Sequence, residues 1–284
     1  MKGPIGVFDS GYGGLTILNQ FRAVLPQYNY LYLGDNARSP YGIRSFDTIY
    51  EYTLEAVKYL FSQNCHLIII ACNTASAKAL VNIQKLDLPL ISPTRRVLGV
   101  IRPTVEEMGC ITTTRHVGIL ATEGTVTSES YLLEMNKLHP ETTVFQEACP
   151  MWVPLIENGE FDSEGARYFI NRNIQNLLSQ SPQIDTILLG CTHYPVLYDV
   201  IQEYIPPHIK IIAQGKIIAK SLKAYLQRHP EIDKMCHKEN YTTFLTTGSA
   251  VDFNKRASSL LNSKVLSTRV ESLIVGEKQL PREK

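Results

Sequence analysis

Short apolar runs alternate with longer amphipathic stretches along most of this 284-residue chain. The apolar runs are rich in β-branched residues, as buried strands are, whereas the stretches between them repeat apolar positions every three or four residues, as helices do. Strand-plus-helix units of about 30 residues predict parallel α/β sheets. The expected strands are 5–9, 30–34, 67–71, 116–122, 143–148, 186–190, 209–213 and 241–246, and the expected helices are 15–25, 45–63, 75–86, 125–137, 163–179 and 214–228.

The segment 93–103 interrupts this alternation. Pro93 and Pro103 bracket it, a helical stretch is expected to run on to Met108, and a new α/β series begins after it. This pattern predicts a crossing between two α/β domains.

Two cysteines follow predicted strands in the same way. Cys72 comes after Leu-Ile-Ile-Ile-Ala and Cys191 after Ile-Leu-Leu-Gly, with hydrogen-bonding side chains next along the chain: Asn73 and Thr74 in one case, Thr192 in the other. Ligands of open α/β sheets bind at the carboxyl ends of the strands. A helix N-terminus directly after the cysteine is expected to lower the thiol pKa. A single buried cysteine is usually an inert core residue, but the repeated pattern suggests two related halves and favours a functional pair.

Two opposed thiols suit stereoinversion at an acidified carbon. One thiolate removes the proton from one face, and the other thiol returns a proton to the opposite face. The carbon acid of an amino acid is very weak, so donors around its carboxylate are needed as well. Backbone amides at strand-to-helix turns are candidates for these donors.

Further candidate residues lie at other predicted strand ends. Asp9 and Ser10 open a Gly-rich turn that departs from the dinucleotide fingerprint, and they suit an ammonium and a carboxylate. Tyr41 and Gly42 end the loop after the second strand, where an ordinary turn is the alternative. His193, two residues after Cys191, is a candidate proton carrier or a satisfied loop histidine.

Two residues at the end of the predicted strand 143–148 are weaker candidates for a role in the site. Cys149 is expected to be a structural thiol near the site, and Glu147 is a weaker binding candidate.

Composition excludes several classes of protein. The net charge is +1 and no long Lys/Arg cluster occurs, which argues against nucleic-acid or membrane surfaces. No apolar run reaches the ~18 residues of a membrane helix, and the N-terminus does not resemble a signal peptide. The six cysteines lack the CxxC or HExxH spacings of zinc sites and do not suggest a disulfide framework. We therefore expect a cytoplasmic protein with no metal and no cofactor.

Five segments spread over most of the chain carry a family resemblance. They are Gly6-Val-Phe-Asp-Ser-Gly-Tyr-Gly-Gly-Leu15, Pro40-Tyr-Gly42, Ala71-Cys-Asn-Thr-Ala75, Glu147-Ala-Cys-Pro150 with Val153-Pro-Leu155, and Gly190-Cys-Thr-His-Tyr-Pro195. In this order they resemble the glutamate racemases of the cofactor-independent aspartate/glutamate racemase superfamily. Ala121-Thr-Glu-Gly-Thr-Val126 is similar to a further loop that faces the ligand in that family.

The resemblance implies interconversion of L- and D-glutamate for peptidoglycan synthesis, without pyridoxal phosphate. It implies two similar three-layer α/β domains with parallel-rich sheets and the substrate between them: 1–98 plus 212–284 carrying Cys72, and 99–211 carrying Cys191. It also implies a homodimer, and it assigns the first-domain thiol to D-glutamate. By the same motifs Cys72 and Cys191 are catalytic, and the substrate-binding residues are Asp9, Ser10, Tyr41, Gly42, Asn73, Thr74, Thr192 and His193.

Two stretches depart from the family pattern, both at expected domain crossings. Arg95–Thr104 carries Arg102 where an acid is common, and Ala213-Gln-Gly215 stands where an Asp-Ser-Gly-like element is typical. These departures bear on hinge behaviour and dimer geometry more than on the chemistry.

Three other functions remain open from the residues alone. They are a racemase for aspartate or another small acidic amino acid, an amide hydrolase using Cys191 with His193, and a catalytically silent amino-acid-binding protein. Discrimination of one methylene is worth only ~1–3 kcal/mol, so the sequence does not separate glutamate from aspartate.

Overall fold

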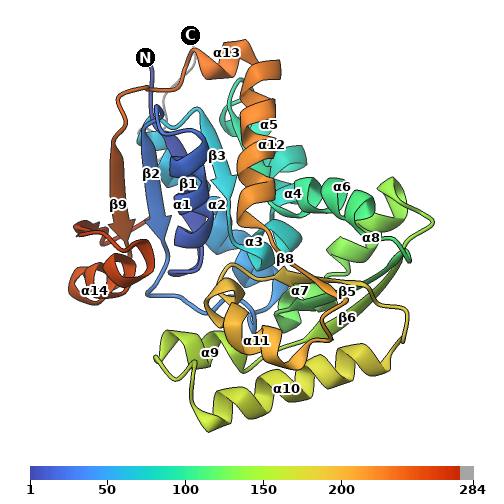
Figure 1. The fold of residues 1–284 in the computed structure, drawn as a ribbon. Coiled ribbons are helices and arrows are strands. Elements are labelled where there is room, and N and C mark those ends of the chain that lie inside the picture. Colours follow the sequence, from blue (N-terminus) through green and yellow to red (C-terminus); the bar gives the residue numbers. More distant parts are fainter. Residues whose placement is uncertain (276–284) are drawn as a thin grey trace.

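The structure is a computed structural model that describes residues 1–275 of the chain, and the end of the expected first domain, 276–284, lies outside the described residues. Two sheets organise these residues, and the strands within each sheet pair in parallel (Figure 1). The expected fold class, two α/β domains with parallel sheets, is confirmed. The exact residues at which one domain passes into the other stay a prediction.

The first sheet has six strands in the order β10-β9-β2-β1-β3-β4. Its strands are β1 (Ile5–Asp9), β2 (Tyr30–Gly34), β3 (Leu67–Ile70), β4 (Arg96–Gly99), β9 (Thr242–Thr246) and β10 (Ser267–Arg269). The helices that accompany it are α1 (Leu15–Val24), α2 (Phe46–Ser62), α3 (Asn73–Lys78), α4 (Leu80–Asn82), the π-helix η1 (Ile83–Asp87), α5 (Leu88–Ile91), α12 (Gly215–Arg228), α13 (Pro230–Asp233) and α14 (Ala250–Leu261).

The second sheet has four strands in the order β6-β5-β7-β8. Its strands are β5 (His116–Ala121), β6 (Thr143–Ala148), β7 (Thr186–Gly190) and β8 (Lys210–Ala213). Its helices are α6 (Ile101–Ile111), α7 (Glu123–Thr127), α8 (Ser130–Leu138), α9 (Trp152–Glu157), α10 (Glu164–Ser179), the 3₁₀ helix η2 (Tyr194–Leu197) and α11 (Tyr198–Tyr204).

The two sheets share one strand order. The run β2-β1-β3-β4 in the first sheet corresponds to β6-β5-β7-β8 in the second. The strands β3 and β7 are therefore equivalent. Cys72 comes after β3, and Cys191 comes after β7. This shared order agrees with the two related halves that the repeated cysteine pattern suggested.

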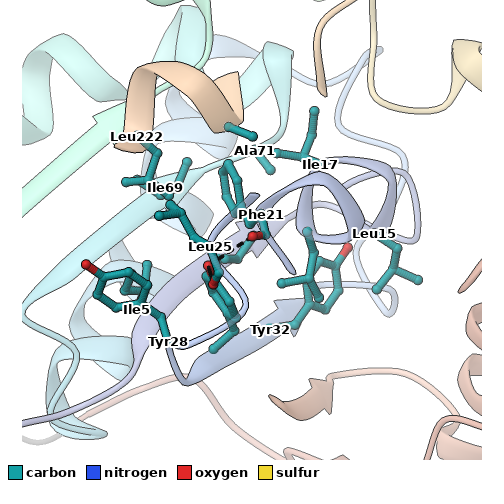
Figure 2. Close-up of a cluster of buried hydrophobic side chains, with 14 of the residues drawn as sticks. Ile5, Leu15, Ile17, Phe21, Leu25, Tyr28, Tyr32, Ile69, Ala71 and Leu222 are labelled. Atoms are coloured by element: carbon teal, nitrogen blue, oxygen red, sulfur yellow. Dashed lines mark hydrogen bonds between the residues drawn. The ribbon is translucent and has the colours of Figure 1, made fainter. Parts of the chain in front are cut away.

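Helices cover both faces of each sheet because successive side chains of a buried parallel strand point to opposite faces. In β1, Ile5 and Val7 pack against α1 and α12, whereas Phe8 packs toward α2. Figure 2 shows the first of these layers, in which Phe21 of α1 lies against strand residues of the sheet. The second sheet is covered in the same way, by α10 and α11 on one face and by α6 and α8 on the other.

Some of the predicted helices begin where the sequence supplies a capping side chain. Ser45 accepts a hydrogen bond from the backbone N–H of Thr48 at the start of α2, and Ser163 accepts one from Ala166 at the start of α10. Such caps satisfy donors that have no partner within the helix.

Two helices that were predicted to be continuous are interrupted in the structure. The helix expected at 75–86 is divided into α3, α4 and the π-helix η1. The helix expected at 125–137 ends at Thr127 and restarts at Ser130, because Glu129 adopts a left-handed conformation with φ of 53°.

The crossing segment also holds an element that the sequence did not predict. Residues 96–99 form β4 and pair with β3, so the chain leaves the first sheet by way of an edge strand. Helix α14 and strand β10, near the C-terminus, were not predicted either. Within residues 1–275, no helix has the length and apolar character needed to cross a lipid bilayer.

Candidate active site

A small cavity lies where residues of the two domains meet. Nine of the ten residues proposed from the sequence line it, namely Ser10, Tyr41, Gly42, Cys72, Asn73, Thr74, Cys191, Thr192 and His193. The tenth, Asp9, lies directly behind, where the Thr192 hydroxyl donates to its Oδ1 at 3.3 Å. The structure therefore brings the whole predicted set together, one thiol from each domain.

Cys72 caps the N-terminus of α3 and is 5% exposed. Its thiol donates to the Ser10 hydroxyl at 3.5 Å. Burial, and to a lesser extent the nearby Asp9, raise the pKa of the Cys72 thiol to about 12, against the lowering effect of its hydrogen bonds with Ser10 and the Ala75 amide. The Ala75 amide at the helix N-terminus lowers this pKa as expected, but the expected net lowering was wrong, because desolvation outweighs that contribution.

Cys191 lies in a different environment, beside a histidine. Its Sγ is 3.9 Å from His193 Nδ1, and His193 Nε2 is 3.2 Å from Oε1 of Glu157. Burial lowers the pKa of His193, but its hydrogen bonds to Cys191 and Glu157 outweigh burial and raise it above the usual value. The same contact with His193 lowers the pKa of Glu157 against the effect of its burial. The chain Glu157–His193–Cys191 therefore favours an imidazolium next to the second thiol.

Asp9 is fully buried beneath the cavity. Its Oδ2 accepts from the Gly11 amide at 2.9 Å. Burial raises the pKa of the Asp9 carboxyl, while His193 and these hydrogen bonds act in the opposite direction. A buried carboxylate with few counter-charges is a suitable partner for the ammonium of an amino acid.

The Gly-rich turn after Asp9 passes very close to the second domain. A Cβ at Gly13 would lie 2.4 Å from Thr192 Oγ1 and 2.5 Å from His193 Nδ1. Only glycine permits this approach, so the turn serves the site as well as the local fold.

Tyr41 lines the cavity, but its hydroxyl is engaged elsewhere. It donates to Oδ2 of Asp35, which also accepts from Arg38. Asp35 raises the pKa of Tyr41 in addition to the larger effect of burial. The phenol is therefore a fixed donor to Asp35, and its ring forms part of the cavity wall.

Threonine hydroxyls join the two domains at another side of the cavity. Thr74 Oγ1 lies 2.9 Å from Thr122 Oγ1, which lies 3.0 Å from Thr125 Oγ1. The backbone amide of Gly124 donates to the Gly42 carbonyl at 2.8 Å. These contacts hold the first-domain loop of Gly42 against the start of α7.

The structure also places three further residues, Cys149, Glu147 and Glu157. Cys149 lines the cavity and is buried, consistent with its reading as a structural thiol near the site. Glu147 lies away from the cavity and accepts from the side chains of Asn173 and Asn176. Glu157 was not singled out, although it is the acidic partner of His193; no local signal in the sequence pairs two residues 36 positions apart.

The described lining of the cavity contains no lysine or arginine. A dicarboxylate would be held there by hydroxyls, amides and the His193 imidazolium. In residues 1–275 no group of three or more His, Cys, Asp or Glu side chains is arranged to hold a metal ion.

Known proteins of one family resemble this chain over most of its length. A profile of the family described as Asp/Glu/Hydantoin racemase matches residues 16–222. The glutamate racemase of Ruegeria sp. (strain TM1040) is 36% identical over 271 residues, which cover 92% of this chain and 97% of that protein. The glutamate racemase of Streptococcus gordonii is 37% identical over 264 residues, which cover 92% of this chain and 96% of that protein.

Solved structures show the same likeness. Glutamate racemase isoform RacE1 from Bacillus anthracis superposes with a TM-score of 0.85 at 30% identity, covering 94% of this chain and 97% of that one. The glutamate racemase from Francisella tularensis, solved in complex with D-glutamate, superposes with a TM-score of 0.84 at 30% identity, covering 96% of this chain and 98% of that one.

Proposed function

The chain belongs to the Asp/Glu/hydantoin racemase family, and we propose that it is a glutamate racemase, an isomerase that interconverts L- and D-glutamate. One observation carries the proposal: two buried thiols, from equivalent strand ends of the two domains, line a single cavity. We further propose that the product D-glutamate supplies peptidoglycan synthesis.

In this mechanism Cys72 and Cys191 act on opposite faces of the α-carbon. The His193 imidazolium stabilises a Cys191 thiolate, which removes the α-proton from one enantiomer. Cys72, with its raised pKa, is the thiol that delivers a proton to the other face. No cofactor takes part in this proposal.

The reverse direction needs a Cys72 thiolate. The carboxylate of Asp9 opposes that charge in the empty site. A substrate ammonium beside Asp9 offsets the carboxylate and makes the thiolate accessible when substrate is bound. Following the family resemblance, we assign removal of the D-glutamate proton to Cys72 and of the L-glutamate proton to Cys191.

The hydrogen-bonding groups around the cavity suit the charges that develop in the reaction. Proton removal places negative charge on the α-carboxylate, and preorganised donors stabilise such charge in a water-poor site. We assign this role to Ser10, Asn73, Thr74 and Thr192, with the backbone amides of the adjoining turns.

The first test is proton exchange. We expect the purified, reduced protein, incubated with L-glutamate in D₂O without added cofactor, to lose both the α-proton signal and the optical rotation. Absence of both changes in folded protein would refute the racemase proposal. L-aspartate in a parallel sample measures the selectivity that the sequence leaves open.

The second test separates the two thiols. Cys72→Ser and Cys191→Ser should each abolish racemisation, because a serine hydroxyl is a far weaker acid than a thiol. Each variant should retain slow α-proton exchange with one enantiomer only: L-glutamate for Cys72→Ser and D-glutamate for Cys191→Ser. Cys236→Ser, which changes a buried thiol outside the cavity, is the matched control and should keep normal turnover. Near-normal racemisation by either active-site variant would contradict the two-thiol mechanism.

We also propose that the protein works in the cytoplasm as a homodimer. Support comes from the family resemblance and from the absence, within residues 1–275, of a helix able to cross a bilayer. Light scattering coupled to size-exclusion chromatography tests the dimer, and fractionation of the source cells tests the location.

A further inference from the structure

A closed ring of buried hydrogen bonds engages Asn73, the residue next to Cys72. Asn73 Nδ2 donates to Gln214 Oε1 at 2.7 Å, and Gln214 Nε2 donates to the Tyr131 hydroxyl at 2.6 Å. The Tyr131 hydroxyl donates in turn to Asn73 Oδ1 at 2.6 Å. Gln214 Nε2 also donates to Thr104 Oγ1 at 2.9 Å. All four side chains are at most 2% exposed.

These four residues join elements of the two domains, and of the four only Asn73 lines the cavity. Asn73 is the first residue of α3 in the first domain, whereas Thr104 and Tyr131 belong to α6 and α8 of the second. Gln214 lies between β8 and α12, where the chain passes from the second sheet to a helix packed on α1.

The Thr104 hydroxyl fixes the direction of every hydrogen bond in this ring. The Thr104 hydroxyl donates to the Val100 carbonyl at 2.7 Å, so its oxygen can only accept from Gln214. Gln214 must therefore turn its NH₂ toward Thr104 and its carbonyl oxygen toward Asn73. Asn73 must then present its own NH₂ to Gln214 and its oxygen to Tyr131.

Without Thr104 the ring would have no preferred direction. In the reversed ring Tyr131 donates to Gln214, Gln214 donates to Asn73 Oδ1, and Asn73 donates to Tyr131. The same number of bonds forms within the ring, but the Asn73 amide is turned over. The bond between Gln214 and Thr104 is what distinguishes the two arrangements.

This direction matters at the cavity, which Asn73 lines. The ring uses one of the two N–H groups of the Asn73 amide, and the second is free to donate to a carboxylate. In the reversed ring the Asn73 oxygen would stand on that side and repel an anion.

The sequence departs from the family pattern at this position. Gln214 stands where a serine of an Asp-Ser-Gly-like element is typical. A serine hydroxyl sits two atoms closer to the backbone than the amide of glutamine and offers a single O–H.

We propose that Gln214 and Thr104 are positioning residues: together they hold the Asn73 amide with its free N–H toward the substrate carboxylate. The proposal rests on the proposed function, since it needs an anionic substrate in the cavity. Neither residue touches the reacting atoms.

The test compares two Thr→Val substitutions with the same local chemistry. Thr104 and Thr53 are both buried, and each donates to the carbonyl four residues earlier, Val100 and Ile49. Thr104→Val leaves the two directions of the ring about equally populated, so it should raise the KM for glutamate about twofold, with kcat essentially unchanged. Gln214→Met removes the ring itself and should raise KM by at least as much. Thr53→Val, which loses only the hydrogen bond to Ile49, should lower the melting temperature but leave KM unchanged.

A second readout does not depend on turnover. In protein labelled with ¹⁵N at asparagine and glutamine, the side-chain amide protons of Gln214 should exchange slowly with solvent, and Thr104→Val should accelerate them while Thr53→Val does not. An unchanged KM in Thr104→Val and Gln214→Met, with only a lower melting temperature, overturns the proposal. If the wild-type protein does not turn over glutamate, the proposed function fails separately. Fast exchange of the Gln214 amide in the wild type would then reject the ring itself.

Discussion

The two thiols have similar exposure but different neighbours. Cys72 is 5% exposed and bonds to a neutral hydroxyl of Ser10, whereas Cys191 is 6% exposed and lies beside His193. Asp9 raises the pKa of both Cys72 and His193, so one carboxylate favours the protonated form of both groups. The two halves of the site are therefore equivalent in fold and unequal in electrostatics.

Glu157→Gln tests the electrostatic side of Cys191. The substitution keeps an oxygen near His193 Nε2 but removes the negative charge, so the pKa of His193 should fall. Because the imidazolium is the form that pairs with a Cys191 thiolate, the alkaline limb of kcat/KM should move to lower pH and kcat should fall about tenfold or more. The measurements are the pH–rate profile and an NMR titration of the His193 ring.

Glu160→Gln is the control for this experiment. Glu160 is an exposed carboxylate three positions further along, after the end of α9. It should leave the alkaline limb in place. A profile for Glu157→Gln that coincides with the wild type would show that Glu157 has no influence on the proton held by His193.

At the scale of elements, the strands were the most predictable part of the chain. Runs such as Leu67–Ile70 are apolar on both faces, which only a buried strand or helix explains, and the polar residues that follow fix the end. The helix breaks were not predictable, because the left-handed Glu129 and the π-helical turn after Asn82 leave no mark in the apolar pattern of the sequence. The strand β4 was hidden by the flanking prolines Pro93 and Pro103 and by its own Arg96, and it pairs in parallel with β3.

Asp185 fastens two of these elements together. Its two carboxylate oxygens accept from the Thr112, Thr113 and Thr186 hydroxyls and from the Thr113 and Thr114 amides, which joins the turn after α6 to the start of β7. These bonds outweigh burial and lower the pKa of Asp185 below its ordinary value of 3.8. A carboxylate whose folded pKa is lowered stabilises the fold above that ordinary value and loses its contribution as the pH falls toward the lowered pKa.

Asp185→Asn should therefore lower the free energy of unfolding at pH 7 by about 1–3 kcal/mol, measured by urea denaturation. The difference from wild type should shrink below about pH 4, where the wild-type carboxyl begins to lose this advantage. Asp162→Asn, which alters an exposed partner of Arg167, should cost less than about 0.5 kcal/mol. If the difference between Asp185→Asn and wild type did not change with pH, the stabilisation would not depend on the negative charge of Asp185.

At the scale of the whole molecule, the sequence predicted which residues gather but not what holds them together. The motifs placed the thiols and their neighbours at strand ends, and shared sheet topology brings strand ends to one edge. The contacts that join the domains are long-range, such as Glu157 with His193 or Gln214 with Asn73, and each side chain has many possible partners in the sequence. A sequence read alone gives no means of choosing among them.

The closeness of the two domains at the cavity gives the last prediction. A Cβ at Gly42 would lie 3.0 Å from Thr122 Cβ and 3.2 Å from its Cγ2. Thr122 cannot yield easily, because a β-branched side chain has few rotamers and its hydroxyl is bonded to Thr74 at 2.9 Å. Gly42→Ala should therefore push the loop of Gly42 away from α7 and raise the KM for glutamate about tenfold, equivalent to about 1.4 kcal/mol of overpacking.

Gly165→Ala is the matched control, since a Cβ there would approach only the Ser163 hydroxyl, at 3.8 Å. Its KM should match that of the wild type, and its free energy of unfolding should rise by about 0.5–1 kcal/mol because alanine is the better helix residue. Saturating glutamate should protect Cys72 and Cys191 from iodoacetamide less well in Gly42→Ala than in the wild type or Gly165→Ala. The reason is that a displaced loop leaves the cavity open. Equal KM and equal protection would mean that the domains close over the substrate without the contact between Gly42 and Thr122.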